Sequence, residues 1–181
     1  ICEHLASHGW DYSENDEAYD AQTALVPEDL ADWVKAAYPE AWQTLEKTHG
    51  SKAPDALANR LRASLDQQGT LECLRGGIDV LGLKHKLKLA QFKPAMGMND
   101  DIVNRYLANR LRVIRQVHYS VHNKNSIDLI LFLNGIPIAT VELKTNNTQS
   151  IEDAVTQYKH DRNPGKGINA EPLLTFPSGA L

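Results

Sequence analysis

N-S-I-D-L-I-L-F-L-N-G-I-P-I-A-T-V-E-L-K, residues 125–144, reads as two apolar strands joined by Asn134-Gly135. Asn-Gly between alternating apolar runs is the strongest short-range signal for a β-hairpin. We therefore predict that residues 127–133 pair antiparallel with residues 136–143. The first strand carries one acid, and the second ends in Glu-Leu-Lys. Charged groups inside apolar runs cost desolvation free energy unless a ligand or partner uses them, so the hairpin is the first place to look for chemistry.

The register of this hairpin decides whether Asp128 and Glu142 can share a ligand. A plain two-residue loop sets Asp128 opposite Val141 and turns the two acids to opposite faces. A loop with an odd residue count, or a bulge at Gly135, sets Asp128 opposite Glu142 and makes the reverse face wholly apolar, as packing under a helix requires. We favour this odd register, which also sets Ile130 opposite Thr140 and Phe132 opposite Ile138, and whose apolar face holds Ile127, Leu129, Leu131, Leu133, Ala139, Val141 and Leu143.

In the odd register, Asp128, Glu142 and Lys144 converge at the open end of the hairpin. Mg²⁺ takes oxygen ligands from one or two carboxylates and keeps several waters, which leaves positions for phosphate oxygens. Such a metal activates water, and a nearby lysine orients that water or stabilises the transition state. The alternative is a surface acid and a Glu/Lys pair at a strand end, since acids and lysines are common. The apolar residues of the two strands favour a metal site over this alternative.

The spacing Asp128…Glu142-x-Lys144 resembles that of the D-(D/E)-x-K nuclease superfamily. The wording I-D-L-I-L-F-L-N-G-I-P followed by V-E-L-K is similar to one branch in particular, the amino-terminal nuclease domain of the restriction (R) subunit of type I restriction-modification enzymes. The similarity extends over most of the chain, through Glu3-His4-Leu5, Gly9-Trp10, Leu74-Arg75-Gly76, Tyr106 with Asn109, Arg115-Gln116-Val117 and Gln157-Tyr158.

This resemblance implies an α/β fold, a restriction-endonuclease-like mixed β-sheet flanked by helices, with an N-terminal helical block. It implies a Mg²⁺-dependent endonuclease, with Mn²⁺ as a possible substitute, that hydrolyses phosphodiesters of double-stranded DNA. Asp128, Glu142 and the Leu143 carbonyl would bind the metal, and Lys144 would position the water. Methylation (M) and specificity (S) subunits would be the partners, and ATP would serve only a motor region in a longer chain of which this is a fragment.

Two auxiliary residues follow from the same resemblance. Glu3 loosely matches a first-helix acid that reaches the metal site in related nucleases. Gln157 matches a glutamine that is followed four residues later by tyrosine and is associated with DNA handling, although Asp161 stands at the tyrosine position here. His4 and His8, at helical spacing, are a remote alternative for zinc, because nothing nearby supplies a convincing fourth ligand.

Composition is that of an ordinary soluble globular domain. The chain has 181 residues, 42% hydrophobic and 23% charged, which suits one domain with a sizeable core. It has no apolar run near the length of a membrane span and no signal peptide, and two cysteines give no disulfide framework, so we expect a reducing cytoplasm and no membrane partner. No dinucleotide or Walker phosphate-binding motif is present.

Charge is distributed unevenly along the chain. Residues 1–80 hold 15 acidic and 6 basic residues, whereas residues 81–181 hold 8 and 13. The positive half is also the half with the candidate site, which favours a polyanionic substrate. The alternative for these basic side chains is a solvated face. The candidates for contact with DNA phosphates are Lys84, Lys86, Lys88, Arg112 and Arg115.

Local patterns predict the remaining elements of a single nuclease domain over residues 1–181, with a helical block to about residue 70 and an α/β core from about residue 71. Proline starts, glycine stops and apolar periodicity predict helices, and alternation predicts strands. The expected helices are 1–9, 27–38, 39–50, 53–68, 99–108 and a helix from about 150 to 158 on the sheet; the expected strands are 78–83, 84–92, 110–120 and 172–177, and residues 11–22 are expected to be a surface loop.

Two rival functions remain open at this level. One is a catalytically silent DNA-binding or docking domain with the same fold, and the other is a DNA-repair or junction-resolving nuclease of the same superfamily. Metal binding between Asp128 and Glu142 separates the first rival from a nuclease. Helicase motifs further along the chain would separate the second.

Overall fold

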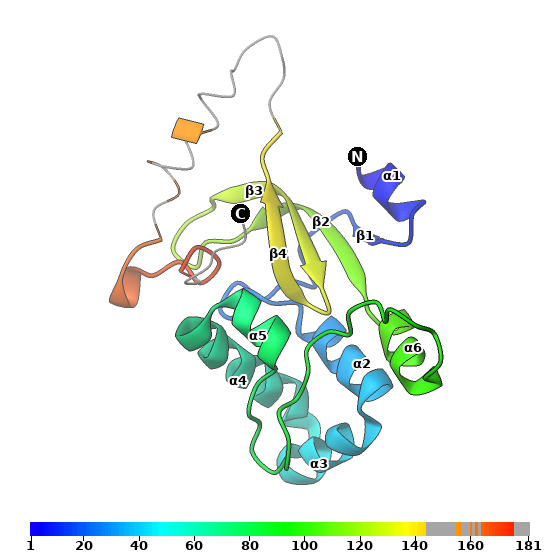
Figure 1. Cartoon of the computed structure of the whole chain (residues 1–181). Helices are drawn as coiled ribbons and strands as arrows, with labels where there is room; N and C mark the ends of the chain where they lie inside the picture. Colours follow the sequence, from blue (N-terminus) through cyan, green and yellow to red (C-terminus); the bar gives the residue numbers. More distant parts are fainter. Residues whose placement is uncertain (144–154, 157–159, 161, 163, 176–181) are drawn as a thin grey trace.

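A computed structural model gives the fold (Figure 1), and it describes residues 1–143, 155–156, 160, 162 and 164–175. The chain is mixed α/β, with a four-stranded mixed sheet flanked by helices, as expected of a restriction-endonuclease-like fold. No helix within the described ranges is long and apolar enough to cross a lipid bilayer. In chain order the elements are α1 (Cys2–Ala6), β1 (Asp11–Ser13), α2 (Pro27–Ala37), α3 (Pro39–His49), the 3₁₀ turn η1 (Gly50–Lys52), α4 (Ala53–Gln68), α5 (Thr70–Gly76), α6 (Asp100–Leu107), β2 (Leu111–His118), β3 (Ser126–Leu133), β4 (Ile136–Val141) and the 3₁₀ turn η3 (Gly167–Asn169).

The predicted helices between residues 27 and 108 are confirmed to within two residues at each end. Proline stands at the first or second position of α2, α3 and α4, where its missing N–H costs no hydrogen bond. Gly50 and Gly69 end α3 and α4 with positive φ angles, which glycine adopts without strain. These local signals are sufficient for α3 and α4, because each has proline at its first or second position and glycine at its end.

The strand order is β1-β2-β3-β4, with β1 parallel to β2 and the other pairs antiparallel. The expectation that residues 11–22 form a surface loop is wrong at Asp11–Ser13, because this segment pairs with Arg112–Ile114 at the edge of the sheet. The expected strands at 78–92 are also wrong: only Ile78 and Leu87 form a bridge there. Residues 172–174 form a turn instead of a strand, and 176–177 lie outside the described residues.

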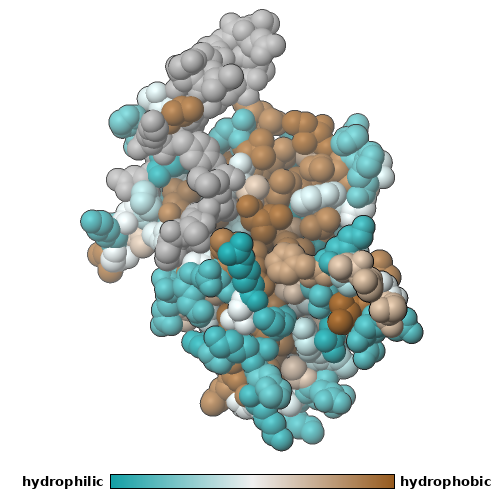
Figure 2. All heavy atoms as spheres, viewed as in Figure 1, coloured by the Kyte–Doolittle hydropathy of each residue, from teal (hydrophilic) through white to brown (hydrophobic). Residues whose placement is uncertain are grey.

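One hydrophobic core joins the sheet to the helical block. Ile114, Ile130 and Phe132 are fully buried and belong to the same cluster as apolar side chains of α2 and α4. Figure 1 shows these helices gathered on one side of the sheet. We expected the helices to cover the wholly apolar face, but among the described residues they pack on the face of Ile130 and Phe132. The face of Leu131 and Leu133 is only partly buried, and Figure 2 shows hydrophobic side chains exposed over β3 and β4.

The hairpin turn at Asn134-Gly135 is tied directly to α2. Both residues have positive φ angles, 51° and 78°, as a two-residue type I′ turn requires. The Val26 N–H donates to the Gly135 carbonyl over 2.9 Å, and a Cβ on Gly135 would overlap the Val26 carbonyl oxygen. Only glycine allows this close approach. Asn134 is fully buried, and its side chain accepts a hydrogen bond from the Arg110 N–H (2.7 Å) and donates to the Leu89 carbonyl (2.8 Å).

Candidate functional site

Asp128 and Glu142 come together at the open end of the β3–β4 hairpin. Leu129 lies opposite Val141, so the two acids, one residue further out on each strand, end the hairpin side by side. Asp128 is close enough to act on the pKa of the Glu142 carboxyl through charge and a side-chain hydrogen bond. The predicted pairing of Ile130 with Thr140 is confirmed.

The irregularity that creates this register lies elsewhere than predicted. The turn itself is a plain two-residue loop, with Leu133 opposite Ile136. The register shifts between Leu131 and Phe132, so Ile138 is an extra residue on β4 and Phe132 lies opposite Pro137. The expected bulge at Gly135, and with it the pairing of Phe132 with Ile138, is therefore wrong. A proline within a sheet is found at edges and bulges, and Pro137 is next to this one.

Asp128 is held by one donor on each carboxylate oxygen. The Gln116 amide donates to Oδ1 over 3.0 Å, and the Leu143 backbone N–H donates to Oδ2 over 2.7 Å. Both donors are neutral, so Asp128 is oriented while its negative charge remains unpaired by any cation in these contacts. This is the arrangement that suits a metal-binding carboxylate.

A cavity of about 470 Å³ opens beside Asp128. Its walls come from the N-terminal segment, β1, β2 and the open end of the hairpin, since α1 packs against β1 and β1 pairs with β2. Glu3 lines the same cavity as Asp128, so the structure brings the auxiliary acid and the central acid together. The full set of lining residues is Ile1, Cys2, Glu3, Tyr12, Glu14, Arg115, Gln116, Asp128, Leu129 and Leu143.

Glu142 has a charged partner, unlike Asp128. The Arg162 guanidinium forms an ion pair with Glu142, and both side chains are less than 10% exposed. Burial raises the pKa of Glu142 above its ordinary value; Arg162 opposes this shift, and the charge of Asp128 adds to it. A second cation beside Glu142 would stabilise the ionised form of its carboxyl group and so lower the raised pKa.

Arg162 is itself fixed by neighbouring groups. Its Nη2 donates to the Ser126 carbonyl over 2.8 Å, and its guanidinium lies 5.1 Å from the Tyr119 ring centre. Burial alone would lower the pKa of Arg162, but the contacts with Tyr119 and Glu142 raise it. The guanidinium therefore stays charged, and Glu142 faces a permanent cation.

The basic residues of the sequence analysis fall into different places. Arg115 is exposed and lines the Asp128 cavity, and a hydrogen bond with Tyr12 raises its pKa. Lys84 and Lys86 line a separate cavity with α3, at the end of the molecule away from the open end of the hairpin (Figure 1). Lys88 is also exposed, and its Nζ donates to the Arg75 carbonyl over 2.9 Å.

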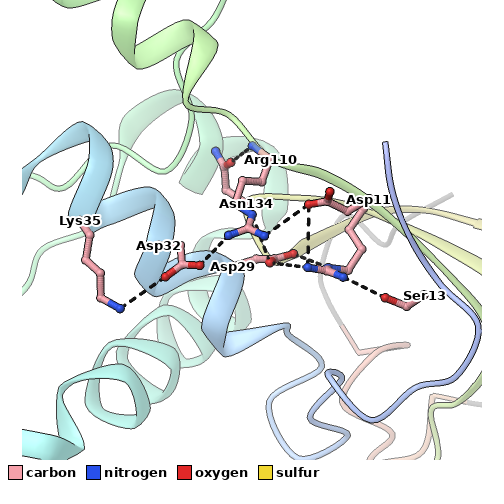
Figure 3. Close-up of polar contacts among 8 residues, drawn as sticks. Asp11, Ser13, Asp29, Asp32, Lys35, Arg110 and Asn134 are labelled. Atoms are coloured by element: carbon pink, nitrogen blue, oxygen red, sulfur yellow. Dashed lines mark hydrogen bonds and ion pairs between the residues drawn. The ribbon is translucent and has the colours of Figure 1, made fainter. Parts of the chain in front are cut away.

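Arg112 lies within the fold instead of on its surface. Its guanidinium binds Asp29 of α2 with two bonds, Nε to Oδ2 at 2.6 Å and Nη2 to Oδ1 at 2.8 Å. Arg110 also binds this helix, with its guanidinium 2.5 Å from Asp32 and 3.3 Å from Asp29; both contacts can be followed in Figure 3. The hydrogen bond with Asp29 raises the pKa of Arg112. These bonds connect the sheet to α2. They also engage the guanidinium of Arg112, which we expected to contact DNA phosphates.

The described residues fit a divalent cation that keeps much of its water. Mg²⁺ needs only one or two protein carboxylates. Asp128 lines a cavity large enough for a hydrated ion, and Glu142 is its neighbour at the end of the hairpin. Within the part of the chain that the structure describes, no group of three or more His, Cys, Asp or Glu side chains could hold a metal. Lys144, Gln157 and Asp161 lie outside the described residues.

Two residues of the site were missed from the sequence. Gln116 lies within the predicted strand at 110–120, but its contact with Asp128 follows only once β2 is aligned with β3. Arg162 follows Glu142 by 20 residues with no periodic signal between them. Gln116 could have been found by extending the register across the third strand, whereas no signal in the sequence points to Arg162.

A known protein family matches almost the whole chain. The family model described as "Type I restriction enzyme R protein N terminus" matches residues 1–178. No curated protein matches the chain, and no solved structure matches it either. Because the family match spans almost the whole sequence, the chain belongs to the family of type I restriction enzyme R protein N-terminal regions.

Proposed function

We propose that this chain is the Mg²⁺-dependent nuclease domain of a type I restriction enzyme R subunit and hydrolyses phosphodiester bonds of double-stranded DNA. The observation that carries the proposal is the meeting of Asp128 and Glu142 at the open end of the β3–β4 hairpin. Membership in the R protein family supports it, because the family's enzymes restrict DNA. The same membership favours an R subunit over a DNA-repair or junction nuclease.

Each residue of the proposed site has a distinct task. Asp128, Glu142 and the Leu143 carbonyl hold Mg²⁺, with Mn²⁺ as a substitute. When bound, the ion supplies a water of lowered pKa and neutralises charge on the phosphate. Lys144 orients the attacking water by donating a hydrogen bond to it. Glu3, which lines the same cavity as Asp128, and Gln157 are proposed auxiliaries.

The proposed DNA path starts at Arg115. This arginine is exposed at the cavity of Asp128, where a phosphate next to the cleaved bond would lie. Lys84, Lys86 and Lys88 are exposed in a different region and would contact DNA phosphates at a distance from the cleaved bond. As an R subunit, the chain would act in a complex with M and S subunits, and ATP would be used by a motor region outside these residues.

Replacing Lys144 with alanine should lower the rate of DNA cleavage by about 100-fold, the usual cost of losing one transition-state donor. The assay uses the full-length R subunit assembled with its M and S subunits, and ATP-driven translocation on DNA should continue. Lys124→Ala is the matched control, because Lys124 is an exposed lysine in the loop between β2 and β3. Cleavage at the unaltered rate by Lys144→Ala would remove Lys144 from the mechanism.

One observation favours a second function, a silent docking domain. Glu142 is already paired with Arg162, and an ion pair of this kind satisfies a carboxylate without any metal. Under this alternative the domain binds DNA or its partner subunits and cleaves nothing. Occupancy of the carboxylate pair by a divalent cation distinguishes the two functions, since the silent domain has no need of the cation.

A further inference from the structure

We infer that Gln116 is the positioning residue of the site and fixes the Asp128 carboxylate for cation binding. This inference rests on the proposed function. Gln116 lies on β2, between Arg115 and Val117, which pair with Leu129 and Ile127 of β3. That register sets Gln116 across from Asp128, the residue between those two partners.

The backbone at Gln116 departs from the strand around it. Its φ angle is 51°, in the left-handed region that residues other than glycine, asparagine and aspartate rarely adopt. The ladder pairs on both sides of Gln116 keep the same register, so the departure is confined to this residue. Such local strain persists where the surrounding structure enforces it, and it is concentrated at functional sites.

The side chain of Gln116, whose backbone has this unusual conformation, donates a hydrogen bond to Asp128. Its Nε2 lies 3.0 Å from Asp128 Oδ1, and an ionised carboxylate accepts hydrogen bonds only, so the amide nitrogen must face it. The Leu143 N–H holds Oδ2. Asp128 is thus fixed by two donors, and each oxygen keeps a lone pair for a cation.

A neutral donor is required at this position. A lysine or arginine would pair with Asp128 as Arg162 pairs with Glu142 and would compete with the metal for the Asp128 carboxylate. Gln116 orients the acid without cancelling its charge. It also lines the cavity beside Asp128, and residues that orient metal ligands in this way typically contribute 10- to 100-fold to metal affinity or activity.

The test measures DNA cleavage against free Mg²⁺ concentration, using the full-length R subunit in complex with its M and S subunits, at saturating ATP. Gln116→Ala and Gln116→Gly should both raise the half-saturating Mg²⁺ concentration by about tenfold or more, while high Mg²⁺ restores most of the maximal rate. Gln67→Ala, at an exposed glutamine of α4, is the matched control.

Gln116→Gly separates positioning from a merely structural role. Glycine accepts the positive φ angle without strain, so this variant should be no less stable to heat than the unaltered protein yet should still need more Mg²⁺. Unaltered Mg²⁺ dependence in Gln116→Gly would overturn the inference, as would an equal shift in the Mg²⁺ dependence of translocation. Failure of the proposed function looks different, because Asp128→Ala would then cleave DNA normally.

Discussion

Replacing Asp128 with alanine is expected to reduce DNA cleavage by the assembled restriction complex by at least about a thousandfold. Asp128 is the one acid of the pair without a cation among its described contacts, so it supplies the charge that attracts the metal. Loss of a metal-bound water costs several kcal/mol of transition-state stabilisation, and each 1.36 kcal/mol is tenfold in rate. Glu142→Ala should have an effect of the same size. Cleavage of a circular DNA substrate by the full-length R subunit with its M and S subunits measures both.

Folding and motor activity should survive the substitution of Asp128. Asp128 is only partly buried, and its donors are the neutral Gln116 amide and one backbone N–H, so its removal leaves no buried charge behind. Asp79→Ala is the matched control, since the Asp79 side chain is 71% exposed on a different segment. Normal cleavage by Asp128→Ala, with translocation intact, would contradict the assignment of the site.

Replacing Asp29 with alanine is expected to lower the free energy of unfolding by about 3–5 kcal/mol, the usual cost of removing one partner of a buried ion pair. The Asp29 side chain is 2% exposed, and it binds Arg112 with two hydrogen bonds. Without it, Arg112 remains in a largely buried position with the more distant Asp11, 3.9 Å away, as its counter-charge, and Arg110 loses one of its carboxylate partners (Figure 3). Chemical denaturation of the purified protein, followed by circular dichroism, measures the change.

Asp32 provides the control on the same helix. It lies one turn after Asp29, and its side chain is 46% exposed in its bonds with Lys35 and Arg110. Exposed ion pairs contribute about 0–1 kcal/mol, so Asp32→Ala should change stability little. Equal losses for Asp29→Ala and Asp32→Ala would show that burial of the Asp29–Arg112 pair does not determine its contribution.

The helical part of this fold was predictable from the sequence because its signals are local. Pro27, Pro39 and the Ala53-Pro54 start, together with Gly50 and Gly69, bound the helices α2 to α4 where they were expected. The β1 strand was not predictable in the same way. Asp11–Ser13 has three residues and no alternation. It forms a strand only because it pairs with the edge of β2, which is far away in the sequence.

The second error in the sheet has a comparable origin. The alternation of basic and apolar residues over 84–89 predicted a strand, but an alternating segment forms a strand only where a neighbour completes the backbone hydrogen bonds. Among the described residues, Leu87 bridges Ile78 alone. Leu87 and Leu89 are buried as predicted from the alternation, while the lysines between them are exposed.

The two acids of the candidate site were predictable from the sequence. Spacing and hairpin logic brought Asp128 to Glu142, and the requirement for an extra residue in the hairpin was right even though the residue is Ile138 instead of one at Gly135. The groups that surround the two acids were not predictable. Gln116 depends on a third strand, and Arg162 depends on a long connection whose path no local pattern specifies.

The most direct test of the central claim is whether a divalent cation binds between Asp128 and Glu142. Crystals of the protein soaked in Mn²⁺ and measured at an X-ray wavelength where manganese scatters anomalously would locate the ion. We expect one anomalous peak within about 2.0–2.4 Å of a carboxylate oxygen of each acid, as is usual for a hard cation with oxygen ligands, and no peak there in Asp128→Ala crystals. The proposed metal site would be contradicted if the soaked crystals showed no manganese beside Asp128 and Arg162 remained paired with Glu142.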